Sequence, residues 1–279
     1  ADIENQLNQL SGTERKNYMD MINLATKYVK DEKYTSNWKY IIIDEFQDTS
    51  FAQYKLINRL LAQNEDTKLY CVGDDWQSIY AFNGADYHLM TDYKFYFGNI
   101  SRIFKNKSAT MIDLNETFRF NNMVSYTTQK FIKKNPKQIK KSLIANQDNI
   151  TDKKSVFIHW TQSDIKEQIN YWLEKYMNSK EFNNKNLLIL SRYNYQFRGL
   201  DKTFRDSVKE RWRDNGKVEY MTCHSSKGTE NDVVLIVGLS SGFLGFPSNI
   251  QDDPVLSLVK YVHDDYLHAE ERRLLYVAM

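Results

Sequence analysis

The run Tyr40-Ile-Ile-Ile-Asp-Glu-Phe-Gln-Asp-Thr-Ser50 constrains the fold of this chain more than any other segment. Ile41 to Ile43 are typical of a buried strand in a parallel sheet, and two acids, Asp44 and Glu45, follow directly. Open α/β sheets bind ligands at the carboxyl ends of their strands. One acid there can hold Mg2+ while its neighbour orients a water, as phosphoryl transfer requires. The alternative is a helix N-cap, which suits the Asp48-Thr-Ser50 end of the run.

Strand-like and helix-like segments alternate along the rest of the chain. Strands are expected at 40–43, 69–72, 111–114, 156–160, 187–190, 218–222 and 233–237. Helices are expected near 51–63, 121–134, 163–178 and 196–211, and from 269 onward. This alternation predicts an α/β fold with parallel sheets and right-handed crossovers. A chain of 279 residues is long enough for two such domains.

Composition narrows the possible partners and the compartment. The net charge is only +2, so a nucleic-acid surface must be a local patch. No run of about 18 apolar residues occurs, so we expect no membrane span, and we see no signal peptide. Cys71 and Cys223 lie in apolar, strand-like runs, which predicts two buried thiols in a reducing compartment, the cytoplasm.

A dense lysine run surrounds Asn135-Pro136. It consists of Lys130, Lys133, Lys134, Lys137, Lys140 and Lys141. Such a patch can follow nucleic-acid phosphates, which would make binding depend on salt. A solvated helix face with a structural turn is the other interpretation, and the sequence leaves both open.

Four more blocks accompany the acidic run. They are Gly73-Asp-Asp-Trp-Gln-Ser-Ile-Tyr80, Leu114-Asn-Glu-Thr-Phe-Arg-Phe120, Met221-Thr-Cys-His-Ser-Ser-Lys-Gly-Thr-Glu230 and Glu270-Glu-Arg-Arg-Leu-Leu-Tyr-Val-Ala-Met279. In this order, the five blocks resemble motifs II to VI of superfamily 1 helicases of the UvrD/Rep/PcrA type. The second block, together with Asn135-Pro-Lys-Gln-Ile139, is most similar to the helicase IV branch.

The resemblance implies two RecA-like lobes of the P-loop NTPase type, each with a parallel sheet. Residues 1–105 would be the carboxyl-terminal part of an incomplete first lobe, and residues 106–279 the second lobe. Roughly a hundred residues separate Arg119 from His224. The large inserted fourth domain of many relatives is therefore expected to be absent or vestigial.

The same resemblance implies ATP and Mg2+ as cofactors and assigns roles in the first motifs. Asp44 would hold Mg2+, directly or through water. Glu45 would orient or deprotonate the attacking water. Gln77 would contact the γ-phosphate and that water.

Further roles fall on the later motifs. Arg119 and one of Arg272 or Arg273 would act as arginine fingers, and Glu230 would contact the nucleotide sugar or a bridging group. Surface ion pairs are the alternative for the arginines, and a solvated loop acid is the alternative for Glu230. The sequence does not separate Arg272 from Arg273.

Single-stranded DNA, or a junction of duplex and single strand, is the partner that the resemblance implies. Tyr80 and Phe82 would stack on bases, and Thr222, His224 and Lys227 would contact DNA from the second lobe. Many relatives carry a basic residue at the position between the two aromatics and tryptophan at the second one. Phe82 can still stack, but Ala81 and Asn83, where basic residues are common in relatives, lack charge and weaken the expectation of tight DNA contact at this site.

No Gly-x-x-x-x-Gly-Lys-Ser/Thr loop occurs in the sequence. We therefore expect a piece of a longer ATP-dependent 3′-to-5′ DNA helicase that does not hydrolyse ATP by itself. Ala1 in place of methionine, and a last motif that ends where relatives continue, favour the same view. Two alternatives remain: a non-catalytic module that binds DNA or protein, and a metal-dependent nuclease using Asp44, Glu45, Asp48 and Asp74.

Overall fold

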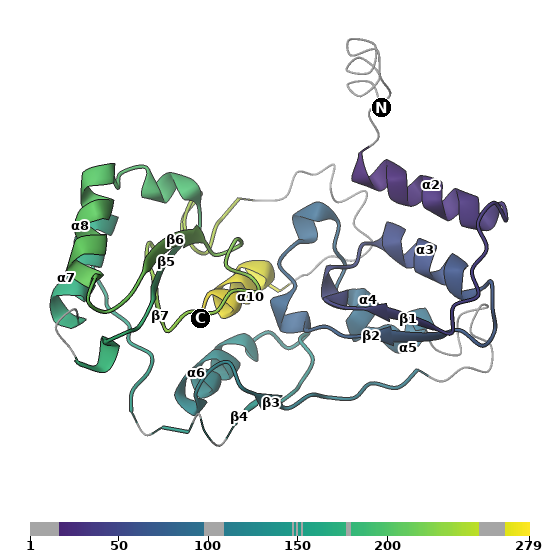
Figure 1. Cartoon of the computed structure of the whole chain (residues 1–279), viewed down its shortest axis with the longest axis horizontal. Coiled ribbons are helices and arrows are strands. Elements are labelled where there is room, and N and C mark those ends of the chain that lie inside the picture. Colours follow the sequence, from purple (N-terminus) through teal and green to yellow (C-terminus); the bar gives the residue numbers. More distant parts are fainter. Residues whose placement is uncertain are drawn as a thin grey trace, which may run out of the picture. The chain divides into compact units, whose positions relative to one another are not determined.

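Parallel strands joined by helices make up both halves of the chain, as the sequence predicts (Figure 1). The computed structural model describes residues 17–97, 109–146, 148, 150–151, 153–176, 180–250 and 266–279. The chain divides into two compact units. The first unit comprises Ala1–Asp74 and Tyr80–Thr110, and the second comprises Asp75–Ile79 and Met111–Met279.

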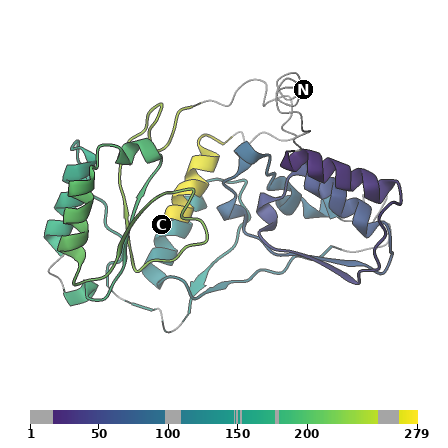
Figure 2. The same ribbon diagram turned by 45° about the horizontal axis from the view of Figure 1, so that its top comes forward.

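The first unit is built around a two-stranded parallel sheet. Its elements are α2 (Tyr18–Lys30), β1 (Tyr40–Ile43), η1 (Phe46–Asp48), α3 (Phe51–Leu61), β2 (Lys68–Cys71), η3 (Ala81–Asn83), α4 (His88–Thr91) and α5 (Tyr93–Phe97). β1 pairs with β2 from Tyr40 opposite Lys68 to Ile43 opposite Cys71. Helix α2 lies along α3, as both views show (Figures 1 and 2).

Helix α3 begins where the sequence places a cap. Ser50 accepts the backbone N–H of Gln53 at 3.3 Å, and its own N–H donates to the Gln53 side chain at 2.7 Å. This reciprocal capping box satisfies two backbone donors that the first helical turn leaves without partners. Because Ser50 performs the capping, Asp44 and Glu45 remain available for another role.

Only one face of the β1–β2 sheet is covered by described residues. Ile41 and Ile43 pack into a core that includes Leu61. Ile42 points to the other face and is 73% exposed, so the expectation of a fully buried strand is wrong there. Cys71 is also exposed, which corrects the prediction of two buried thiols, because it lies on a sheet with no further strand beside it in the described part of the chain.

The second unit holds the larger sheet. Its elements are η2 (Asp75–Gln77), β3 (Glu116–Thr117), α6 (Asn122–Ile132), β4 (Ile144–Ala145), α7 (Ile165–Tyr176), η5 (Lys180–Phe182), β5 (Leu187–Ser191), η6 (Asn194–Phe197), α8 (Lys202–Trp212), β6 (Val218–Thr222), β7 (Val233–Ile236) and α10 (Ala269–Ala278). The strand order is β6-β5-β7, with all pairs parallel.

Central strand β5 is buried on both faces, as its continuous apolar sequence predicts. Leu187 and Ile189 face the core formed with α7 and α8, which lie side by side on one side of the sheet (Figures 1 and 2). Leu188 and Leu190 point the other way, toward the end of α10. Strand β5 is therefore covered on both faces, and its second face borders a pocket.

Two expected strands do not form. Residues 111–114 and 156–160 are irregular, and the short parallel pair β3–β4 stands nearby in sequence instead. Ile112 and Ile158 are exposed, and neither run pairs with a strand among the described residues. The expected boundary at residue 105 lies outside the described residues. Between Arg119 and His224, the described residues form no compact unit beyond the second one.

In the part of the chain that the structure describes, no helix combines the length and the apolar character that crossing a bilayer requires.

Candidate functional site

The acidic pair of the first unit stands directly after β1. Glu45 has a left-handed backbone, with φ of 50°, and its N–H donates to Asp44 Oδ1 at 2.8 Å. This conformation is uncommon outside glycine and carries local strain, which often marks functional positions. The turn holds both carboxylates at the strand end. No group of three or more His, Cys, Asp or Glu residues is arranged to hold a metal in the described part of the chain.

Gln47 connects this turn to the end of β2. Its side chain is fully buried, its amide nitrogen donates to the Glu45 carboxylate, and its carbonyl oxygen accepts the Asp74 N–H at 2.9 Å. The Phe46 N–H donates to the Val72 carbonyl at 2.8 Å. Glu45 is therefore held directly by Asp44 and Gln47, while Phe46 and Gln47 connect the turn to the segment after β2.

Gly73 leaves the space that Gln47 occupies. A Cβ at this position would lie 2.6 Å from Gln47 Oε1 and 3.1 Å from the Phe46 nitrogen. We expect Gly73→Ala to lower the free energy of unfolding by about 1–3 kcal/mol, because Gln47 and the turn must shift. Urea denaturation measures the loss. Gly199→Ala, with nothing within 4 Å of its Cβ, is the control, and equal stability of the two variants would contradict the prediction.

Two aromatic candidates for DNA binding lie together in the first unit. The rings of Tyr80 and Phe82 pack edge to face, with centroids 5.9 Å apart. Phe82 is 62% exposed, so most of its ring is open to a ligand. Of the expected DNA contacts, Phe82 is the one that presents a large exposed apolar ring.

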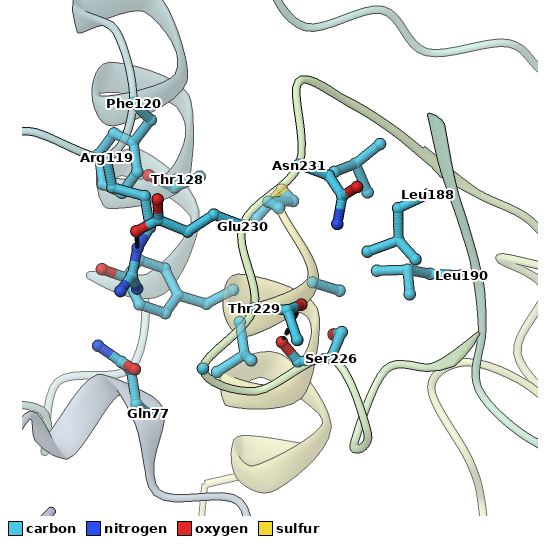
Figure 3. A pocket seen from close by; sticks show the side chains of 16 residues that line it. Gln77, Arg119, Phe120, Thr128, Leu188, Leu190, Ser226, Thr229, Glu230 and Asn231 are labelled. Carbon is cyan, nitrogen blue, oxygen red and sulfur yellow. Dashed lines mark hydrogen bonds and ion pairs between the residues drawn. The ribbon is translucent and has the colours of Figure 1, made fainter. Parts of the chain in front are cut away.

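A pocket in the second unit collects residues from four of the five sequence blocks (Figure 3). Gln77, Arg119 and Glu230 all line it. Arg119 Nε donates to Glu230 Oε1 at 2.7 Å, and both side chains are about half exposed. Figure 3 shows the two side chains meeting, with Gln77 nearby. A cation, a carboxylate and an amide thus converge on one small space.

The size of this pocket limits what it can hold. Its volume is about 130 Å³, and Leu188 and Leu190 form an apolar wall opposite the charged pair (Figure 3). Pockets that enclose a whole small-molecule ligand measure roughly 300–1,000 Å³. The second unit by itself therefore encloses only part of a nucleotide-sized ligand.

Gln77 reaches this pocket because the short segment Asp75–Ile79 packs inside the second unit. Asp75 is fully buried. Its carboxylate accepts the side-chain N–H of Gln138 at 2.7 Å, the backbone N–H of Ile139 at 2.8 Å and the ammonium of Lys141 at 2.9 Å. This buried acid therefore anchors the segment in the second unit.

Trp76 adds an apolar anchor next to Asp75. Its ring is fully buried against Ile132 and Tyr276, and its Nε1 donates to the Ile139 carbonyl at 3.1 Å. Lys141 lies 4.7 Å and Lys133 5.8 Å from the ring centroid. For these two members of the lysine run, the structural interpretation is therefore supported.

Replacing Lys141 tests the anchor. We expect Lys141→Met to lower the free energy of unfolding by about 3–5 kcal/mol, because it leaves the buried Asp75 carboxylate without its cation. Chemical denaturation measures the change, with Lys140→Met on the exposed neighbour as control. Adding Asp75→Asn to Lys141→Met should recover part of the loss, and a Lys141→Met protein as stable as the wild type would contradict the account.

The two arginines of the last block lie outside the pocket lining. Arg273 is only 2% exposed, and its Nε donates to the Ser78 carbonyl at 2.6 Å. Arg272 donates to the Phe131 carbonyl at 3.2 Å and lies 4.7 Å from the Phe131 ring. In this structure neither guanidinium is placed beside Arg119 as a second finger.

The expected DNA contacts on the loop after β6 are engaged within the protein. Thr222 Oγ1 accepts the Ser225 N–H at 3.2 Å. Lys227 Nζ donates to the Gln77 carbonyl at 3.0 Å. Arg192 Nη1 lies 3.3 Å from His224 Nδ1. Thr222, His224 and Lys227 therefore all make contacts within the protein.

The surroundings of His224 favour its uncharged form. Burial, and next the Arg192 guanidinium, lower its pKa below the usual range, against the raising effect of Glu271 and a backbone hydrogen bond with Ile79. Arg192 in turn makes a bidentate pair with Glu271, at 2.7 Å for the closest atoms. This pair was not predicted from the sequence: Arg192 lies outside the five blocks, and Glu271, although it lies in the last block, was given no role.

Comparison with known proteins fits these observations. A model of the UvrD/REP helicase N-terminal domain matches residues 3–98, and a model of the UvrD-like helicase C-terminal domain matches residues 201–279. This chain belongs to the UvrD/Rep helicase family. The two lobes of this family have the RecA-like P-loop NTPase fold, which agrees with the parallel sheets of both units.

Individual relatives of this family align over most of the chain. DNA helicase IV of Escherichia coli is 35% identical over 262 residues, which is 94% of this chain and 35% of that protein. A probable DNA helicase of Mycoplasma pneumoniae is 27% identical over 89% of the chain and 42% of its own length. A probable DNA helicase II homolog of Rickettsia conorii is 31% identical over 63% of the chain and 25% of its length. The chain thus spans about a quarter to two-fifths of these relatives.

Proposed function

We propose that this chain is the part of an ATP-dependent DNA helicase that senses the terminal phosphates of ATP. The convergence of Gln77, Arg119 and Glu230 on one pocket carries the proposal. An arginine and a glutamine at such a pocket suit the charge and the hydrogen-bond acceptors of a phosphoryl group. The 130 Å³ volume fits the phosphate end of the ligand and leaves the rest of ATP to other parts of the protein.

The residues present fit such a phosphate group. The guanidinium of Arg119 carries five N–H donors, and the contact with Glu230 uses the one on Nε. The remaining donors of Arg119 can point at phosphate oxygens, with Glu230 holding the orientation. Gln77 can offer its amide N–H to a phosphate oxygen and its carbonyl oxygen to a water.

The acids of the first unit suit the remaining chemistry. Carboxylate oxygens are the ligands that Mg2+ prefers, and Asp44 is the residue that would hold it. Bound Mg2+ would neutralise phosphate charge during hydrolysis. Glu45, fixed by Gln47, would orient the attacking water and accept its proton.

We propose that the protein moves along single-stranded DNA and that Phe82 is the principal residue of the first unit that stacks on a base. We expect Phe82→Ala to weaken binding by about 1–3 kcal/mol, roughly 5- to 150-fold in Kd. Fluorescence anisotropy with a labelled oligonucleotide measures the change. Phe95→Ala removes an equally exposed ring from α5 and is the control; equal effects of the two substitutions would contradict the assignment.

The direction of movement is proposed as 3′ to 5′, on the resemblance of the motifs to UvrD-type enzymes. Strand displacement on duplexes with a 3′ or a 5′ single-stranded tail tests this. Activity on the 3′-tailed duplex alone is expected, and activity confined to the 5′-tailed duplex would reverse the proposal.

The chain lacks a phosphate-binding loop, so we propose that it works within a longer protein, called the complete protein below. The purified 279-residue chain should show no appreciable ATP turnover, with or without DNA. The complete protein should hydrolyse ATP and be stimulated by single-stranded DNA. If the 279-residue chain hydrolysed ATP at the rate of the complete protein, the proposal that it needs the rest of that protein would be contradicted. A complete protein that binds DNA without hydrolysing ATP would favour a binding module instead.

A further inference from the structure

Asp75–Ile79 belongs to one domain by sequence and to the other by packing. The family model of the N-terminal domain covers it, and Asp74 and Tyr80 on either side are part of the first unit. The segment itself is packed within the second unit. Its fixed position decides where the Gln77 side chain stands at the pocket.

Side chains of the second unit hold the backbone on the far side of Gln77. Lys227 Nζ donates to the Gln77 carbonyl at 3.0 Å, and Arg273 Nε donates to the Ser78 carbonyl at 2.6 Å. The next residue, Ile79, has a backbone hydrogen bond with His224. Asp75 and Trp76 anchor the near side, so Gln77 is held from both directions.

We infer that Arg273 and Lys227 are positioning residues that act through Gln77, rather than groups that touch phosphate or DNA. The inference rests on the proposed function of Gln77 at the phosphate pocket. Arg273 is buried and its Nη1 also donates to Gln138 at 3.4 Å, so reaching a phosphate would require it to leave its hydrogen bonds. Lys227 commits one of its three N–H donors to the Gln77 carbonyl, which fixes the direction of its side chain.

A double-mutant cycle in the complete protein separates positioning from direct contact. Arg273→Met should lower kcat of DNA-stimulated ATP hydrolysis at least ~10-fold in the wild-type background, as expected for loss of a buried, charge-assisted hydrogen bond. In a Gln77→Ala background the same change should lower kcat less than ~2-fold, because the side-chain amide that Arg273 positions is already absent. A full additional loss in that background would overturn the inference. Arg119→Ala, which removes a direct contact, should still add its effect there.

Hydrogen exchange provides a second readout on the 279-residue chain itself. In Lys227→Met and in Arg273→Met, the amides of Trp76–Ile79 should exchange at least ~10-fold faster than in the wild type. Arg213→Met, on the exposed end of α8, should leave their exchange unchanged. Unchanged exchange in both pocket-side variants would overturn the inference.

Further measurements distinguish a variant that fails to fold, and a failure of the proposed function, from a failure of this inference. Arg273→Lys retains a buried cation and a donor, and circular dichroism identifies any variant that fails to fold. If Arg273→Met is unfolded, the partly exposed Lys227 supplies the same tests through Lys227→Met. A complete protein without ATP turnover would refute the proposed function, while the exchange measurement would still decide whether these residues hold the segment.

Discussion

Replacing Arg119 by alanine is expected to lower kcat of DNA-stimulated ATP hydrolysis by the complete protein about 10³-fold or more. Arg119 lines the pocket with Gln77, and its pairing with Glu230 aims the guanidinium into that space. An arginine that meets charge developing in the transition state contributes mainly to kcat, so KM should change little. Steady-state kinetics with saturating single-stranded DNA measure both constants.

Arg213→Ala is the matched control for Arg119→Ala. Arg213 also pairs with a glutamate on the surface, Glu210, at 2.8 Å, but it stands at the end of α8 outside the pocket lining. Its loss should leave kcat unchanged. If Arg119→Ala kept its kcat and only bound ATP less tightly, Arg119 would contact ATP in the ground state without stabilising the transition state.

Glu45→Gln should lower kcat by about 10²- to 10⁴-fold, the usual contribution of a general base. The substitution preserves size and removes the charge that would orient the water and accept its proton. It also leaves Gln47 an oxygen to donate to, so the turn after β1 should keep its structure. Rapid measurement of phosphate release at saturating ATP records the effect.

Glu65→Gln, in the exposed loop before β2, controls for loss of one negative charge from the first unit. Circular dichroism and thermal unfolding should be the same for both variants and the wild type. Full activity of Glu45→Gln would show that its acid has no role in hydrolysis.

Local patterns in the sequence predict much of the fold, because the spacing of apolar and capping residues determines which side chains are buried and where a helix begins. The continuous apolar run of β5 and the cap at Ser50 are confirmed in this way. The irregular segments at 111–114 and 156–160 have strand-like composition but no ladder partner among the described residues. Ile42 shows the same limit, since its exposure depends on what covers a sheet face and not on its own chemistry.

The sequence predicts which residues lie at the candidate site better than it predicts the atoms that each of them contacts. Gln77, Arg119 and Glu230 were expected at the nucleotide, and they share one pocket. Arg273 and Lys227 were expected to touch phosphate and DNA, yet each donates to a backbone carbonyl of the Asp75–Ile79 segment. A motif shows that a cation is present, whereas only packing shows which acceptor it meets.

A crystal structure of the complete protein with Mg2+ and a non-hydrolysable ATP analogue tests the central claim most directly. The account predicts a terminal phosphate oxygen within hydrogen-bond distance, about 2.7–3.2 Å, of both Arg119 and the Gln77 side chain. It also predicts that Arg273 remains bonded to the Ser78 carbonyl, as it is here. Terminal phosphates bound away from Arg119 and Gln77, or contacted by Arg273, would contradict it.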